Sequence, residues 1–158
     1  MSLTTTLPHV CGFDFLVGDW TVHNRRLRHP LRGGSEWYEV EATATSRTLH
    51  NGAISVDEMW FEESGFAGCA FRLHDPATDA WTIYWVSSQT GRLQPPVIGR
   101  WSDGEFEAEG SDEYAGVAIR VRFRWTPIGS DKARWVQSFT ADGSAWEDNW
   151  VMEWQRTG

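Results

Sequence analysis

Apolar and polar residues alternate with a period of two through most of the chain, and few segments show the 3.6-residue period of an amphipathic helix. The alternating segments are rich in β-branched and aromatic residues and are separated by short turn sequences such as Asp142-Gly143. We therefore predict an all-β protein of about ten strands. The strands are expected at Asp19–Leu27, Ser35–Thr45, Ala53–Phe61, Phe66–His74, Ala80–Val86, Val97–Trp101, Glu105–Ser111, Val117–Trp125, Arg134–Thr140 and Trp146–Arg156.

The connections between these segments are short, which favours antiparallel neighbours in a closed barrel or a sandwich. Closure into a barrel would remove the exposed sheet edges. The longest connection, Gln89–Pro96, is expected to form a mouth or a lid. Only Val10–Val17 resembles a short helical turn, and its apolar side chains are expected to close one end.

Charged residues alternate along the segment Gly104–Trp125 and predict a cross-strand ladder. A tight loop near Tyr114 and Ala115 would place Glu109 opposite Arg120 and leave the apolar positions facing inward. The same loop pairs Glu107 with Arg122 and Glu105 with Arg124. We prefer this solvated ladder to a strand that binds nucleic acid, because the chain has a formal net charge of -8.

The last hairpin turns at Asp142-Gly143, and its register has two solutions. A two-residue loop places Gln137 opposite Asp148 on an inward face otherwise made of tryptophans. This loop also aligns Phe139 with Trp146 and Trp135 with Trp150. A three-residue loop would instead present Glu147, Asn149 and Glu153 to the interior.

Alternation from Trp20 separates the inward from the outward side chains of the first strand. Asn24 and Arg26 are predicted to point inward, whereas His23 and Arg25 point to solvent. The same rule predicts further inward side chains at Tyr38, Val40, Ala42, Ile54, Val56, Glu58, Trp60, Cys69, Phe71, Leu73, Trp81, Ile83 and Trp85.

Composition limits the class of protein. The 158 residues suit one domain, 1–158, with 1–12 as a tail, and 11 tryptophans supply a large apolar surface. The acidic net charge disfavours nucleic acids and anionic membranes as partners. The first ten residues lack the features of a secretory signal, and the two cysteines, Cys11 and Cys69, suit reduced thiols, so we expect a cytoplasmic protein.

The sequence Gly18-Asp19-Trp20, preceded by a short apolar turn, resembles the Gly-x-Trp opening of the lipocalin and calycin superfamily. The stretches FDFLVGDWTVHNRR, RLHDPATDAWTIYWV, PPVIGRW and WEDNWVMEW resemble a bacterial family of uncharacterised lipocalin-like proteins. The resemblance implies an up-and-down barrel in which Trp20 lies at the closed end under a basic residue, for which Arg156 is the candidate. Nitrobindins, related ten-stranded haem barrels, need a proximal histidine late in the chain. The last histidine here is His74, so we expect no haem.

The function we expect is binding of a small hydrophobic or aromatic molecule inside the barrel by a carrier or sensor, with Arg26 as an anchor for a carboxylate. The candidate ligand-binding residues are Asn24, Arg26, Tyr38, Glu58, Trp60, Trp81, Trp85, Trp135, Gln137, Asp148 and Trp150. One alternative is an enzyme in which Glu58 and Asp148 act as acid and base, and another is a protein-interaction module with a filled barrel. We expect no metal, because the histidines are scattered at His9, His23, His29, His50 and His74, and we leave a homodimer open.

Overall fold

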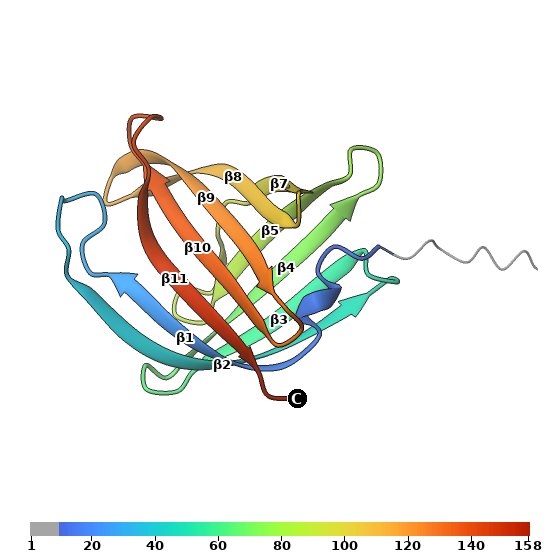
Figure 1. Cartoon of the computed structure of the whole chain (residues 1–158). Helices are drawn as coiled ribbons and strands as arrows, with labels where there is room; N and C mark the ends of the chain where they lie inside the picture. The colour runs from blue at the N-terminus through green and yellow to red at the C-terminus, as the bar shows by residue number, and fades with distance from the viewer. Residues whose placement is uncertain (1–9) are drawn as a thin grey trace, which may run out of the picture.

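Ten long strands and the two-residue strand β6 form a closed barrel in a computed structural model, which describes residues 10–158 (Figure 1). Each strand is antiparallel to its neighbours, and the ring closes where β1 pairs with β11 and β4 pairs with β5. The bounds are β1 Gly18–Leu27, β2 Trp37–Leu49, β3 Ile54–Phe61, β4 Phe66–Asp75, β5 Ala80–Ser87, β6 Arg92–Leu93, β7 Val97–Ser102, β8 Glu105–Tyr114, β9 Val117–Ile128, β10 Lys132–Thr140 and β11 Glu147–Arg156. The predicted up-and-down barrel is confirmed.

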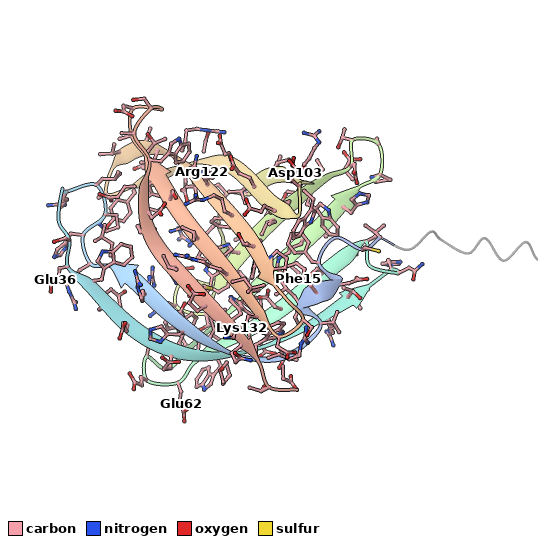
Figure 2. The ribbon with its side chains drawn as sticks, viewed as in Figure 1. Phe15, Glu36, Glu62, Asp103, Arg122 and Lys132 are labelled. Atoms are coloured by element: carbon pink, nitrogen blue, oxygen red, sulfur yellow. The ribbon has the colours of Figure 1, made fainter. Side chains whose placement is uncertain are left out.

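A single 3-10 turn, η1 (Asp14–Leu16), lies across one end of the barrel. Phe13 and Leu16 are fully buried there, as expected for the plug predicted at Val10–Val17. In Figure 2, Phe15 and Asp103 mark this closed end, whereas Glu36 and Glu62 lie at the opposite, open end. Most of the predicted tail, together with His9, lies outside the described residues.

Trp20 and Arg156 meet at the closed end as the resemblance implied. The guanidinium of Arg156 lies 4.3 Å from the centroid of the Trp20 ring and donates to the carbonyls of Val17 and Phe15. The indole N–H of Trp20 donates to the carbonyl of Leu16 at 2.8 Å. The contact therefore ties β1, β11 and η1 together.

The outward side chains of β8, β9, β10 and β11 form a surface that we call the charged wall. Its position was predicted correctly, but the register was wrong by two residues, because Glu107 faces Arg124 and Glu109 faces Arg122. The turn lies at Ala115-Gly116, where both residues have positive φ, as a two-residue hairpin loop requires. The charged wall consists of Glu107, Glu109, Arg120, Arg122, Arg124, Arg134, Asp148 and Glu153.

Both predicted registers of the last hairpin are wrong. The connection between β10 and β11 is longer than three residues, because the carboxylate of Asp142 accepts hydrogen bonds from the amides of Ser144 and Ala145. Trp135 therefore faces Met152 and Gln137 faces Trp150. A bulge follows at Gln137/Ser138 and turns Asp148 to the outside.

The inward and outward faces of β3 and β4 are the reverse of the prediction. Asp57 and Met59 on β3 and Gly68 and Arg72 on β4 point into the barrel and are buried. The side chains wrongly predicted to point inward are Ile54, Val56, Glu58, Trp60, Cys69, Phe71 and Leu73. The outward face of these strands is the more apolar one, which is the physical reason for the error.

Candidate functional site: an aromatic cavity with two arginines

The barrel encloses a cavity of about 320 Å³. The long connection after β5 lines its mouth through Gln89, Gln94 and Pro96, in agreement with the prediction. Asp112 and Glu113, at the open end of β8, also border the cavity. The aromatic side chains of the lining are Phe66, Trp85, Tyr114, Phe123, Trp125, Trp135, Phe139, Trp150 and Trp154.

Arg26 lines the cavity from the open end of β1, and its guanidinium lies over a tryptophan ring. Its guanidinium carbon is 3.9 Å from the centroid of the Trp150 ring, which faces it across the β1–β11 pairing. Burial lowers the pKa of the Arg26 guanidinium, while the nearby phenols of Tyr38 and Tyr114 oppose this effect. Within residues 10–158, no carboxylate forms an ion pair with Arg26.

Asn24 is fully buried and holds the tryptophan against which Arg26 stacks. Its side-chain oxygen accepts a hydrogen bond from the indole N–H of Trp150 at 2.8 Å, and its amide donates to the carbonyl of Val22. Trp150 also makes edge contacts with Trp85 and Trp135. These contacts restrict the Trp150 ring, so Asn24 orients the cavity wall instead of lining the cavity itself.

A second arginine lies deeper, towards the closed end. Arg72 on β4 donates to the carboxylate of Asp57 on β3 at 2.5 Å and to the hydroxyl of Ser55 at 3.1 Å. The side chains of Arg72 and Asp57 are only 3% and 2% exposed. The guanidinium lies 5.1 Å from the Phe13 ring and 5.4 Å from the Trp125 ring. The charges of Arg72 and Asp57 therefore compensate each other away from water, at the floor of the cavity.

The structure brings five of the predicted ligand-binding residues to the cavity. These are Arg26, Trp85, Trp135, Gln137 and Trp150. Gln137 donates from its amide to Asn149, which is buried at the bulge of β11. Trp81 is buried below the cavity in edge contact with Phe13. Tyr38 is on β2, where it faces Arg26 of β1 in the cross-strand register and lies under the guanidinium of Arg28.

Three predicted site residues lie on the outer surface of the barrel instead. Glu58 and Trp60 are exposed on β3, so the prediction that they face the interior is wrong. Asp148 is exposed and pairs with Arg124 at 2.9 Å on the charged wall. Glu58 and Asp148 therefore cannot act as an acid and a base inside the cavity.

Sequence reasoning missed Asp57 and Arg72. A signal for them exists in the hairpin around Glu62–Gly65, because pairing Phe61 with Phe66 places Asp57, Gly68 and Arg72 on one face. The structure explains the glycine at this position, since an added Cβ at Gly68 would lie 2.0 Å from the Trp85 ring. The higher apolar content of the opposite face outweighed the hairpin signal and led to the wrong assignment.

Between Val10 and Gly158, no three His, Cys, Asp or Glu side chains cluster closely enough to hold a metal ion.

In the same part of the chain, no helix has the length and hydropathy that would be needed to cross a bilayer.

No protein-family model matches the sequence, and no curated protein is significantly similar to it. Among solved structures, the crystal structure of Rv2717c from M. tuberculosis resembles this barrel with a TM-score of 0.55 and 11% sequence identity. The match covers 91% of this chain and 94% of that chain. At this identity the likeness supports a common fold only.

Proposed function

We propose that the barrel binds a small aromatic or hydrophobic molecule that carries one acidic group, as a carrier or a sensor. The observation that carries this proposal is the cavity of about 320 Å³ with an arginine that has no carboxylate partner in the described chain. The volume is at the lower end of the range for small-molecule pockets, roughly 300–1,000 Å³. A ligand of one or two rings suits this space.

The unpaired charge of Arg26 is the reason to expect an acidic group on the ligand. An arginine remains protonated even when burial lowers its pKa, and a partly buried charge without a partner, such as that of Arg26, is unfavourable. Stacking on Trp150 offsets part of this cost, since an arginine over a ring contributes about 0.5–2 kcal/mol. A ligand carboxylate would offset more of it through charge-assisted hydrogen bonds.

Arg72 differs from Arg26 and is a weaker candidate for the anchor. Its charge is already paired with Asp57, and its second nitrogen donates to Ser55. We therefore assign recognition of the acidic group to Arg26, and stabilisation of the cavity floor to the Arg72–Asp57 pair.

The lipocalin-like resemblance supports the same proposal, because barrels of that superfamily use their interior for small ligands. The alternative of a filled barrel fits less well with the enclosed volume. The enzyme hypothesis is less favoured, because its two carboxylates, Glu58 and Asp148, lie on the outer surface of the barrel. We continue to propose a protein that needs no haem or metal.

A matched pair of probes tests the proposal by isothermal titration calorimetry. We expect naphthalene-2-carboxylate to bind at least about tenfold more tightly than the uncharged naphthalene-2-carboxamide, equivalent to about 1.4 kcal/mol. Arg26→Met should abolish this preference, because methionine retains the apolar stem without the charge. Arg25→Met is the control, since Arg25 stacks on Trp37 outside the cavity and should leave the preference unchanged.

Two results would contradict the proposal in different ways. If neither probe nor any other one- or two-ring compound binds, the barrel is not a small-molecule site. If acid and amide bind equally well in the wild type, the cavity binds ligands but Arg26 does not select for an acidic group.

A further inference from the structure

Two residues at the floor of the cavity carry a buried N–H group that has no acceptor in the described chain. These groups are Nε of Arg72 and the indole Nε1 of Trp154, and both residues line the cavity. Each residue is only 2% exposed. A buried donor without an acceptor is destabilising, and most buried polar groups in proteins have a partner. The floor of the cavity therefore holds donors that residues 10–158 do not satisfy.

The two donors belong to one region of the barrel. Trp125, which also lines the cavity, has its ring centroid 5.4 Å from the guanidinium carbon of Arg72 and 5.3 Å from the ring centroid of Trp154. Arg72 is on β4 and Trp154 is on β11, so strands from different parts of the chain bring both donors to the same end of the cavity. We call Arg72, Trp125 and Trp154 the floor subsite.

We infer that the floor subsite binds a neutral hydrogen-bond acceptor of the ligand, either a hydroxyl or a carbonyl oxygen. The inference rests on the proposed function, because it describes the other end of the molecule whose acidic group Arg26 recognises. An oxygen acceptor suits the subsite, since an arginine and an indole nitrogen can only donate. The acceptor is neutral because Asp57 already compensates the charge of Arg72, and a second carboxylate there would repel Asp57.

The spacing along β11 agrees with a ligand of one or two rings. Trp150, over which Arg26 lies, is separated from Trp154 by four positions on this strand. At a rise of about 3.3 Å per residue, this separation is about 13 Å. A hydrogen bond of about 2.9 Å at each end shortens the distance that the ligand itself must span. The ligand class is therefore an aromatic acid with a hydroxyl or keto group at the end opposite to the acid.

Two probes of similar size test the inference by isothermal titration calorimetry. The far end of 6-hydroxynaphthalene-2-carboxylate offers an oxygen acceptor, whereas 6-aminonaphthalene-2-carboxylate offers an aromatic amine, which donates and accepts poorly. We expect the hydroxy probe to bind at least about tenfold more tightly, because a site that binds an oxygen rejects analogues that leave its buried groups unpaired. Trp154→Phe should reduce this preference at least about threefold, because it removes one of the two donors and keeps an aromatic ring.

Trp135→Phe is the matched control for the ring substitution. Trp135 also lines the cavity, but its indole nitrogen is not a buried donor without an acceptor. The substitution should change the affinity of both probes alike and leave the preference for the hydroxyl unchanged.

The indole N–H resonance of Trp154 provides a second readout in the wild type, which does not depend on the stability of a variant. The hydroxy probe should shift this NMR resonance downfield relative to the amino probe, because a new acceptor deshields the proton. The two probes have the same rings, so their ring currents affect the resonance alike.

Three results would overturn the inference and leave the proposed function intact. The first is equal affinity of the hydroxy and amino probes for the wild type. The second is a preference that Trp154→Phe does not reduce, together with an unmoved Trp154 resonance, because the oxygen would then lie elsewhere. The third is binding of naphthalene-2-carboxylate but of neither substituted probe. If none of the three acids binds, the proposed function fails, and the inference fails with it.

Discussion

The charged wall and the outer face of β3, β4 and β5, which we call the apolar wall, distribute polarity in opposite ways. On the charged wall, Glu109 and Arg122 face water while Phe123 and Trp135 face the cavity. On the apolar wall, Phe71 and Tyr84 face outward, whereas Asp57 and Arg72 lie inside. The comparison shows that alternation identifies a strand, but does not by itself decide which of its two faces lies in the interior.

The two walls differ because the interior of this barrel is not uniformly apolar. On the charged wall, solvation of the charges and burial of the rings favour the same orientation. On the apolar wall these two preferences conflict, and the buried arginine is retained because Asp57 and Ser55 are its partners. Its outer face therefore exposes apolar surface to solvent.

The largest expected effect follows from breaking the buried ion pair inside the apolar wall. Asp57→Ala leaves Arg72 desolvated without its carboxylate, and we expect a loss of about 3–5 kcal/mol in the free energy of unfolding. Urea denaturation followed by tryptophan fluorescence measures this loss. If the variant does not fold, adding Arg72→Met should restore a folded protein, because it removes the unpaired charge.

The control for this prediction lies on the charged wall. Glu109 pairs with Arg120 at 3.4 Å in solvent, so Glu109→Ala should cost only about 0.2–1 kcal/mol. Equal losses for Asp57→Ala and Glu109→Ala would remove the energetic distinction between the walls.

A smaller effect is expected from crowding the inner face of the apolar wall. An added Cβ at Gly68 would lie 2.0 Å from the Trp85 ring, so Gly68→Ala should displace that ring and cost about 1–3 kcal/mol. Chemical denaturation would measure the loss of stability, and the near-UV circular dichroism of the tryptophans would report the displacement of the Trp85 ring. Gly34→Ala is the control, because a Cβ there would meet no heavy atom of the described chain within 4 Å. Unchanged stability in Gly68→Ala would show that the cavity wall is loosely packed.

The smallest effect concerns His23, whose charge faces solvent on β1. Glu41 and Glu39 raise the pKa of His23 above its usual value, although burial opposes them. Because the folded-state pKa is raised, the stabilisation is complete below a pH of about 6.5 and disappears as the pH rises through the folded-state pKa. NMR titration of the ring protons should show the raised pKa, and Glu41→Gln should bring it down.

Glu36→Gln is the control for this titration, because Glu36 pairs with Arg28 and not with His23. A His23 titration that is identical in wild type and Glu41→Gln would show that the carboxylate does not set the pKa. A strong pH dependence of unfolding that survives Glu41→Gln would have to arise elsewhere in the molecule.

Much of the barrel and part of the cavity could be predicted from the sequence. Trp20 and Arg156 meet as the resemblance implied, and Arg26, Trp85 and Trp135 line the cavity, because alternation and hydrophobicity agree on those strands. Asp148 could not be placed. A hydrogen-bonded loop around Asp142 and a bulge in the middle of the hairpin together decide its orientation.

The order of apolar and polar residues is sufficient to specify the strands, their antiparallel order around the barrel and the plug at Val10–Val17. Only closure of the barrel decided that Asp57 and Arg72 face the interior and that Trp60 and Phe71 face outward. The physical reason is that the preference of one strand for a face depends on its partners. Arg72 is tolerated inside because a neighbouring strand supplies the carboxylate of Asp57, and no single segment contains that information.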